Sequence, residues 1–446
     1  MLKLFLWLRY LHKRKIVLLS VAAVALSVSL LIVVSSLFTG FIHAFEQSAV
    51  EAMGDIVIAP PTRFAAYPRL IENLERLAAV EAATATLASQ GLLHLGRGNV
   101  RAVKVWGIEP ASRAGVTGFK KALRRQAGSP AEPSFAVPGQ PHKVGGFLGV
   151  AVIAEPDEKT DEYDFSEIEK MIGGDVVLTM GTLTTEQQDA QPQVKRRTIR
   201  FAVADIVFTG VYYLDKNFVY LPLEQLQQEL YPDEPAPVAD QVQIKLADGA
   251  DLDSALAQIR GLWRVFAAES LGWNSYLIDY TDIESSQQMQ SRYVAELIKQ
   301  MGVLLLIFGV VSFGVVLLVF CIFYMIVRLK QKDVAVVKTC GATSTSVALV
   351  FVGFGGCVGI TGAALGTALG WLITKNINTI DAWISIVFGL KLWKSSIYMF
   401  SKIPNEVNWH SVWLIIASAV AAVAAGSLVP AVIAAQTRPV YILRYE

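Results

Sequence analysis

Residues 301–327, MGVLLLIFGVVSFGVVLLVFCIFYMIV, contain no charged side chain. An apolar run of about 20 residues is long enough to cross the hydrocarbon core of a bilayer as a helix. At about 1.5 Å per residue this longer run spans roughly 40 Å, so we expect its helix to tilt or to project beyond the lipid. The stretch predicts a transmembrane helix and places the chain among membrane proteins.

Three further runs without charge predict that the chain crosses the membrane four times. They cover residues 16–42, 346–374 and 411–436. The first is much longer than the apolar core of about 7–15 residues in a cleaved signal peptide, so we interpret it as a retained helix. The composition agrees with a membrane protein, because 53% of the 446 residues are hydrophobic and only 17% are charged, against about a quarter charged in soluble domains.

The charges predict the orientation of the chain and exclude one class of partner. Lys and Arg total 39, and Asp and Glu total 38, so there is no basic excess with which to bind nucleic acid. Basic side chains cluster before the first run and in residues 328–338. By the positive-inside rule we expect both termini and this inner segment to be cytoplasmic.

About 250 residues separate the first two predicted helices, enough for an independent folded domain. Helical and strand patterns are mixed in them, so we predict an α+β domain with a modest sheet. Strands are expected at 55–59, 100–108, 199–211, 218–221 and 242–246, helices at 70–79, 223–230 and 252–262, and loops at 127–146 and 155–169. The two loops are either solvated connectors or partner-binding segments.

No arrangement of side chains in the sequence indicates an enzyme. The five histidines are scattered, and none forms an HExxH pair or a Cys/His ligand set. The three cysteines show neither a disulfide framework nor a catalytic signature, and no GxxxxGK(S/T) phosphate loop occurs. We therefore predict no catalytic residue, no metal site and no cofactor bound by this chain.

Two features of the membrane segments point to a mechanical role. Glycines recur at spacings of three or four along the third helix, a pattern that lets another helix approach closely, although membrane helices are rich in glycine in general. These glycines are Gly355, Gly359, Gly362, Gly366 and Gly370. The second feature is the inner segment 328–345, RLKQKDVAVVKTCGATST, in which a short amphipathic helix is expected to end near Gly341. It is either a helix that presses on a cytoplasmic partner or a solvated basic loop.

The predicted fold is an α-helical membrane protein with four transmembrane helices and a large α+β extracytoplasmic domain inserted between helices 1 and 2. The predicted segments are an interfacial amphipathic helix (1–15), transmembrane helix 1 (16–42), the outer domain (43–295), transmembrane helix 2 with a stalk (296–327), an inner helix (328–345), transmembrane helix 3 (346–374), an outer loop (375–410), transmembrane helix 4 (411–436) and a cytoplasmic tail (437–446). Residues 1–15 have an alternative interpretation as an extension of helix 1.

Two motifs resemble a known family. DVAVVKTCGAT, residues 333–343, is similar to the D-I-A-I-L-R-T-M-G-A-T stretch of the permease subunits of mechanically working ABC exporters, and residues 430–446 resemble their P-A…R-P…L-R-x-E ending. Within that MacB/FtsX-like mechanotransmission superfamily the lipoprotein-releasing (LolC/LolE-type) branch is the most similar. Residues 201–223, FAVADIVFTGVYYLDKNFVYLPL, and the last outer loop carry this likeness, with Asp205 where the family pattern has Gly.

The resemblance implies a non-catalytic permease subunit of an ABC export or extraction complex in the inner membrane. Such a complex releases lipoproteins or other lipid-anchored or amphiphilic cargo by ATP-driven mechanotransmission. The implied partners are an ABC ATPase subunit dimer that carries ATP and Mg, a second permease chain in a homo- or heterodimer, and a periplasmic acceptor. Two alternatives remain, a macrolide-exporter-type efflux permease with a separate ATPase and an FtsX-type signalling subunit that regulates extracytoplasmic hydrolases.

The resemblance also assigns roles to particular residues. Coupling to the ATPase is assigned to the inner segment, at Lys332, Asp333, Val334, Lys338, Thr339, Gly341 and Ala342. Cargo is expected to enter laterally between the first and second helices, near Phe41, Phe45 and Met301. The outer domain is expected to have the MacB-like core fold.

Overall fold

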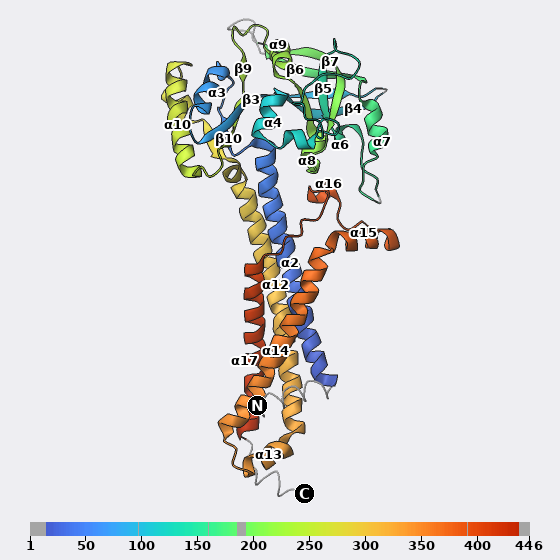
Figure 1. The fold of residues 1–446 in the computed structure, drawn as a ribbon, viewed down its shortest axis with the longest axis vertical. Coiled ribbons are helices and arrows are strands. Elements are labelled where there is room, and N and C mark those ends of the chain that lie inside the picture. Colours follow the sequence, from blue (N-terminus) through green and yellow to red (C-terminus); the bar gives the residue numbers. More distant parts are fainter. Residues whose placement is uncertain (1–14, 97, 159, 185–192, 390, 437–446) are drawn as a thin grey trace. The chain divides into compact units, whose positions relative to one another are not determined.

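The computed structural model describes residues 15–436 apart from 97, 159, 185–192 and 390 (Figure 1). The chain divides into two compact units. The membrane unit comprises Met1–His43, Val294–Ile380 and Ile403–Glu446, and the outer unit comprises Ala44–Tyr293 and Asp381–Lys402. The predicted tail at 437–446 and all but the last residue of the predicted interfacial helix at 1–15 lie outside the described residues.

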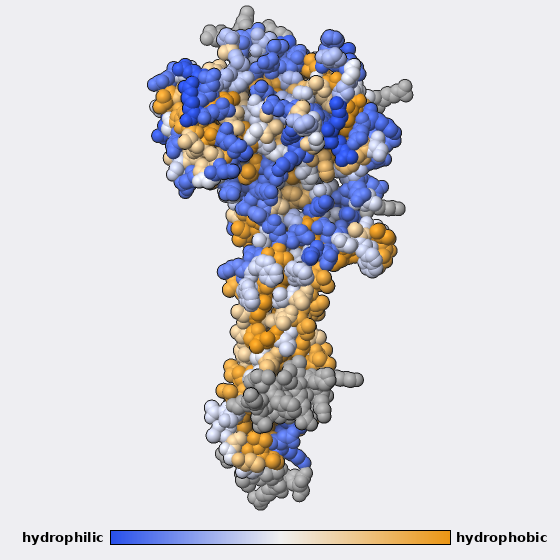
Figure 2. Space-filling model, in the orientation of Figure 1, coloured by the Kyte–Doolittle hydropathy of each residue, from blue (hydrophilic) through white to orange (hydrophobic). Residues whose placement is uncertain are grey.

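Among the described residues, four helices are long and apolar enough to cross a membrane. They are α2 (Lys15–Met53), α12 (Ser286–Leu329), α14 (Ser344–Lys375) and α17 (Trp409–Gln436). Figure 2 shows apolar surface over these helices and mainly polar surface over the sheet-bearing domain. The space around the helices must be lipid or protein, because apolar surface of this extent is unfavourable in water.

Two of the membrane helices extend well beyond the bounds expected for them. α2, expected to end at residue 42, continues to Met53. α12 begins at Ser286, ten residues before the predicted bound of 296, and so includes nearly all of the polar, helix-compatible stretch 285–296 into which the sequence allows the stalk to continue. The 44 residues of α12 make a helix of roughly 66 Å, about twice the thickness of the hydrocarbon core. The absence of charged residues identifies only the part of a helix that lies in lipid. The outer extensions of α2 and α12 contain charged residues, so this criterion does not detect them.

The region predicted as an outer loop at 375–410 contains two helices. It contains α15 (Ile377–Phe388) and the short α16 (Ser395–Tyr398). On the inner side, the segment predicted as one helix at 328–345 is α13 (Gln331–Thr339), followed by a turn before α14 begins at Ser344. The turn exists because Gly341 has a φ of +95°, in the left-handed region that ends helices.

The glycines of α14 contact two different helices. Gly355 and Gly359 lie against α17, where a Cβ on Gly359 would stand 3.2 Å from the Cα of Val420. The three outer glycines, Gly362, Gly366 and Gly370, lie against Val24, Val28 and Ile32 of α2. One face of α14 is therefore in backbone-close contact with α17 in its inner half and with α2 in its outer half.

A polar contact joins α2 to α12 within the apolar part of the membrane unit. The hydroxyls of Ser27 and Ser312 lie 2.8 Å apart, within hydrogen-bonding distance. Beside this pair a cavity of about 340 Å³ lies between α2, α12 and α17. The surrounding core is formed by buried Val, Ile and Phe side chains from all four helices.

The outer unit is built on a sheet that has nine strands among the described residues, in the order β11-β1-β10-β3-β4-β8-β5-β7-β6. The strands are β1 (Ile56–Ala59), β3 (Val80–His94), β4 (Val100–Ile108), β5 (Gly145–Gly149), β6 (Asp175–Thr184), β7 (Gln193–Val207), β8 (Phe218–Pro222), β10 (Gln241–Leu246) and β11 (Asp282–Ser285). β2 (Phe64–Ala65) and β9 (Val238–Ala239) form a separate pair. The expectation of a modest sheet is wrong.

Helices cover the sheet and enclose its core. They are α3 (Tyr67–Glu75), α4 (Pro110–Val116), α5 (Phe119–Ala122), α6 (Val150–Ile153), α7 (Phe165–Ile168), η1 (Glu169–Met171), α8 (Tyr212–Asn217), α9 (Leu223–Leu230), α10 (Leu252–Glu269) and α11 (Ser275–Asp279). In Figure 1, α3 and α10 lie near β10 at one end of the sheet. Leu70 and Leu74 of α3 are buried in one core with Ile259 and Trp263 of α10.

Several predicted elements match their observed counterparts, and others miss. The strand at 100–108 and the helix at 223–230 have the predicted bounds. The helix predicted at 70–79 ends at Glu75, because the chain then enters β3. β3 begins VEAATATLAS, a run of small residues without an alternating apolar pattern, and its strand state is set by pairing with β10 and β4 on its two sides.

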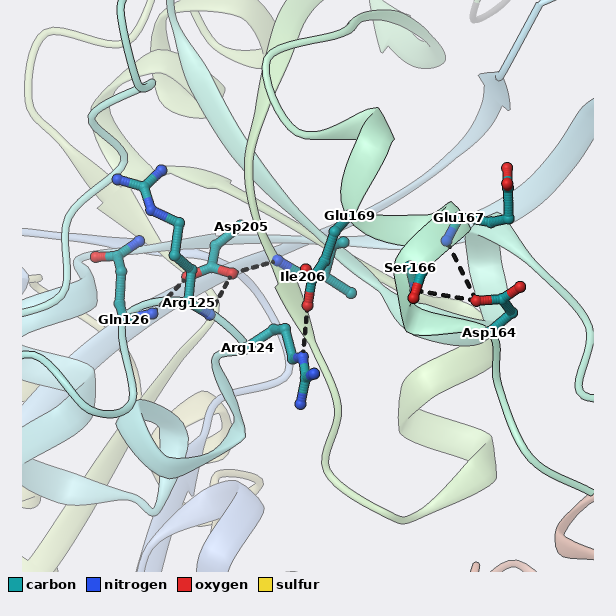
Figure 3. A network of polar contacts seen from close by, with 9 residues as sticks. All are labelled: Arg124, Arg125, Gln126, Asp164, Ser166, Glu167, Glu169, Asp205 and Ile206. Atoms are coloured by element: carbon teal, nitrogen blue, oxygen red, sulfur yellow. Dashed lines mark hydrogen bonds and ion pairs between the residues drawn. The ribbon is translucent and has the colours of Figure 1, made fainter.

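Asp205, which departs from the family pattern, has a structural role. Its carboxylate is fully buried in β7 and accepts hydrogen bonds from the backbone N–H groups of Arg125 and Gln126, each at 3.0 Å, and from that of Ile206 at 2.8 Å (Figure 3). A buried carboxylate is tolerated when its oxygens are satisfied in this way. Asp205 therefore fastens the 124–126 turn to the sheet.

The contact between α14 and α2 predicts the effect of one substitution. In Gly366→Val the new Cβ would stand 2.6 Å from the carbonyl oxygen of Ala25, so the helices must separate, at a cost of about 1–3 kcal/mol. We expect a lower thermal unfolding midpoint in detergent. Gly356→Val is the matched control, because no atom lies within 4 Å of its Cβ position, and an equal loss in both variants would contradict the packing role.

Candidate functional site

The inner end of the membrane unit carries α13, which packs on the neighbouring helices through one side. Val334 and Ala335 are buried, and Val334 forms a small core with Val327, Val347 and Ala434 from α12, α14 and α17. The ammonium of Lys338 donates a hydrogen bond of 2.6 Å to the carbonyl oxygen of Ala435, near the end of α17. α13 is thus held against the inner ends of three membrane helices.

The residues predicted to couple to an ATPase do not share one side of α13. Lys332, Thr339 and Gly341 are exposed, Asp333 forms an ion pair with Lys330, and Ala342 is half-buried. Val334 and Lys338 face the membrane helices instead. The prediction missed Val336 and Val337, whose side chains are 50% and 52% exposed. Four consecutive small apolar residues, 334–337, gave no indication of which two would be buried.

The residues predicted at the cargo entrance lie on α2 and α12 but have different surroundings. Phe41 and Met301 are partly exposed in the membrane unit. Phe45 packs against Tyr293, with ring centroids 4.6 Å apart. Phe45 therefore holds the outer parts of α2 and α12 together.

An apolar face of α12 that sequence analysis did not single out is exposed along much of the helix. Val303, Leu306, Val310 and Phe313 follow one another at spacings of three and four, and all four are exposed. Side chains at these spacings lie on one side of a helix. In a membrane this face contacts lipid, cargo or another chain, so it belongs to the candidate site. Hydrophobic periodicity could not reveal it, because the helix is apolar all round.

α2 and α12 are each joined directly to a strand of the sheet, and these two strands are neighbours. After α2, Gly54 takes a φ of +78° and leads into β1, and β11 leads directly into α12. β1 and β11 pair in an antiparallel register with Ile56 opposite Ser285. The N–H of Ser286 donates a 2.9 Å hydrogen bond to the carbonyl oxygen of Asp55. The outer ends of both helices are therefore fixed to neighbouring strands of one sheet.

Arg113 of α4 reinforces this junction from inside the outer unit. Its buried guanidinium donates hydrogen bonds to the carbonyl oxygen of Ala52, at 2.9 Å, and to Oε1 of Gln243, at 3.0 Å. It also lies over the rings of Trp106 and Phe119, at 4.7 and 5.5 Å from their centroids. Burial lowers the pKa of Arg113 to about 10, so the group stays charged at neutral pH. It links the last turn of α2 to β10.

The segment 395–401 is strapped to the outer unit by backbone hydrogen bonds. The N–H of Ser395 donates to Oδ2 of Asp161 at 2.7 Å, and that of Tyr212 donates to the carbonyl oxygen of Met399 at 2.7 Å. The N–H of Ser401 donates to the carbonyl oxygen of Gly210 at 3.1 Å. We call residues 395–401 the strap.

The turn that receives the strap is held by the buried carboxyl of Asp215. This group accepts hydrogen bonds from the N–H and Oγ1 of Thr209, at 2.7 and 2.8 Å, and from the N–H of Gly210, at 3.1 Å. Burial raises the pKa of Asp215 to about 7, and the hydrogen bonds act in the opposite direction.

Over the described residues, no group of three or more His, Cys, Asp or Glu side chains is placed to hold a metal ion.

Replacement of Arg113 tests the junction. Arg113→Met keeps much of the side-chain volume but removes the charged donors, and a hydrogen bond to a charged group contributes about 1.5–3 kcal/mol. We expect the unfolding midpoint of the outer unit to fall, as measured by differential scanning fluorimetry in detergent. The exposed Arg125 provides the control Arg125→Met, and a fall of the same size in both variants would argue against a special role for Arg113.

The pKa of Asp215 predicts how stability depends on pH. Because this pKa is raised from 3.8 to about 7, the folded chain binds the proton more tightly than the unfolded chain. The stabilisation is present at low pH and is lost as the pH rises through about 7. We expect the unfolding midpoint of the outer unit to decrease between about pH 4 and about pH 7 and to level off above that range, and Asp215→Asn to flatten that decrease.

The control for this titration is Asp205→Asn, which removes the other buried carboxylate that organises a turn. It should lower the unfolding midpoint while the decrease with pH persists. A decrease that is unchanged in Asp215→Asn would contradict the assignment.

Comparison with known proteins shows what the chain is similar to. Residues 305–439 match the family described as FtsX-like permease C-terminal. The periplasmic region of MacB from Actinobacillus actinomycetemcomitans is 11% identical, covers 55% of this chain and 95% of that structure, and has a TM-score of 0.33. The lipoprotein-releasing system transmembrane protein LolE of Haemophilus influenzae is 26% identical over 440 residues, which is 95% of this chain and 93% of LolE. LolC of Neisseria meningitidis is 25% identical over 462 residues, which is 100% of this chain and 99% of LolC. The part of the chain from 305 to 439 is thus similar to FtsX-like permeases, and nearly the whole chain is similar to the lipoprotein-releasing proteins LolE and LolC.

Proposed function

We propose that this chain is the permease subunit of an ABC complex that releases lipoproteins from the inner membrane by mechanotransmission. The sequence match to LolE and LolC along nearly the whole chain carries the proposal. The FtsX-like match over 305–439 supports it, because that region includes α13 and most of the membrane helices. The lipid-anchored cargo is the substrate of this process, and the chain itself performs no chemistry on it.

The motor in this proposal is a separate ABC ATPase dimer that binds ATP and Mg beneath α13. The side of α13 that faces away from the membrane helices offers Val336, Val337 and Lys332 to such a partner. Two exposed apolar residues beside a lysine fit a small docking surface on another protein, because an isolated protein seldom exposes adjacent large apolar side chains without a use for them. N and C termini then lie in the cytoplasm with α13.

Movement of α13 would reach the far side of the membrane through continuous helices. Val334 and Lys338 join α13 to α12, α14 and α17. α12 then runs without a break from Leu329 to Ser286, where it meets the sheet. A helix is stiff along its axis because each turn is closed by hydrogen bonds, so it suits the transmission of a push.

The cargo in this proposal enters laterally between α2 and α12. Phe41 and Met301 lie on these helices, and the exposed apolar face of α12 from Val303 to Phe313 provides a surface for acyl chains or for a second permease chain. Removal of an acyl chain from lipid costs about 0.8 kcal/mol per CH₂, and this cost is the reason for coupling release to ATP. The outer unit then passes the lipoprotein to a periplasmic acceptor.

The test is lipoprotein release from proteoliposomes that contain this chain, its ATPase and its partner permease. Release should require ATP, and it should fall strongly in Val336→Asp and Lys332→Glu, together with loss of ATPase co-purification. Lys338→Met should keep the ATPase bound but reduce release, because the Lys338 contact to Ala435 seats α13 on the membrane helices. Lys121→Glu is the charge control, since Lys121 is exposed and lies in the outer unit, outside α13.

Two outcomes would contradict different parts of the proposal. Absence of any ATP-dependent release by the unmodified complex would reject lipoprotein release as the function. Full release and full ATPase binding by Val336→Asp and Lys332→Glu would leave the function standing and reject α13 as the docking element.

A further inference from the structure

α15 begins two residues after the membrane helix α14 ends. α14 ends at Lys375, and α15 covers Ile377–Phe388 with the sequence INTIDAWISIVF. Three crossings by α2, α12 and α14 bring the chain to the side of the membrane that holds the sheet-bearing domain. α15 therefore starts at the headgroup level of that side. Its polar and apolar faces indicate whether it is surrounded by water, protein or lipid.

Three of the four polar side chains of α15 face the protein, and the fourth, that of Thr379, is exposed. Asn378, Asp381 and Ser385 form a single stripe, with spacings of three and four. The amide of Asn378 exchanges two hydrogen bonds with the backbone of Ile403, at 2.9 and 3.0 Å. Asp381 is buried and lies 3.5 Å from Nζ of Lys391, and it also accepts a hydrogen bond from the N–H of Trp393 at 3.3 Å.

The apolar side chains of α15 face outward. Trp383, Ile386 and Val387 lie on one side of the helix and are 60%, 83% and 52% exposed, and an apolar patch is visible where α15 ends (Figure 2). Phe388 at the end of α15, Leu392 after it and Ile397 of α16 are exposed as well. A helix on the surface of a soluble protein buries its apolar side and shows its polar side to water. α15 has the reverse arrangement, which requires an apolar medium outside it.

The charges around α15 indicate which apolar medium this is. Between residues 375 and 402 the sequence contains one acid, Asp381, and four lysines. Asp381 is buried against Lys391, while Lys375 and Lys402 are exposed. Lysines beside tryptophan and tyrosine are typical of the bilayer interface, where the aromatic rings lie at the headgroup level and the ammonium groups attract anionic phosphates. A protein partner would not need this combination.

We propose that α15 and the turn after it form a foot that is inserted in the adjacent leaflet of the bilayer. α15 lies in the plane of the membrane, with Trp383, Ile386 and Val387 among the acyl chains and the neighbouring lysines at anionic headgroups. The strap follows directly and is hydrogen-bonded to Asp161, Gly210 and Tyr212 of the outer unit. The foot therefore anchors the outer unit to the lipid surface at a second place besides α2 and α12.

Spin labels test the foot in the full-length chain in nanodiscs of phosphatidylethanolamine and phosphatidylglycerol. The native cysteines Cys321, Cys340 and Cys357 are changed to serine, and single labels are placed by Ile386→Cys, Trp383→Cys or Ser385→Cys. The control is Tyr276→Cys, an exposed site in α11 of the outer unit. Collision with oxygen, relative to a water-soluble nickel chelate, should be several-fold higher at 386 and 383 than at 276, and intermediate at 385.

Each other outcome of this experiment has a defined meaning. Equal access of the nickel chelate at positions 386, 383 and 276 would show that α15 is in water and would overturn the proposal. Shielding of 386 and 383 from both reagents would show a protein partner and would also overturn it. Replacement of phosphatidylglycerol by phosphatidylcholine should reduce the oxygen preference at 386, because the attraction of the lysines is lost.

Discussion

The antiparallel pairing of β1 with β11 is the constraint on which the arrangement of the outer unit depends. These two strands continue α2 and precede α12, so one set of ladder hydrogen bonds decides how the helix ends are placed relative to each other. β1 is buried on both faces, at Ile56 and Ile58 on one and at Val57 on the other, so a shift of one residue would exchange side chains between two packed faces. The register is therefore held firmly, and Arg113 adds a second link between the end of α2 and the same sheet.

The membrane unit is held by close contacts of a different kind. Along one face of α14 glycines leave room for α17 and α2 to come close, so side chains such as Val24 and Val28 of α2 pack directly against the α14 backbone. At the inner end the buried side of α13 unites three helices in one small core. A force applied to α13 is therefore distributed over several helices. The exposed face of α12, in contrast, does not pack against another of the described helices.

Residues 301–327 and the other three charge-free runs are helical in the structure. A helix is the structure expected for such a run in lipid, because it satisfies its own backbone hydrogen bonds where no water is present. Helix ends are harder to predict, since beyond the lipid they depend on contacts such as that of Phe45 with Tyr293. β3 was missed because its small residues become a strand only between β10 and β4. In the site, the motif around Asp333 located α13. Which side of α13 faces outward, with Val336, depends on contacts with distant residues such as Ala435. The role of Arg113 likewise depends on a distant residue, Gln243.

The hydrogen-bonded pair of Ser27 and Ser312 has a consequence for any separation of α2 from α12. Hydrocarbon supplies no water to replace a broken hydrogen bond, and an orphaned hydroxyl there is costly. A serine in a helix has one ready alternative, because its hydroxyl can rotate to the carbonyl oxygen one turn back along its own helix. The two serines thus make a latch that can be undone by rotation of two side chains, with each helix supplying its own substitute acceptor.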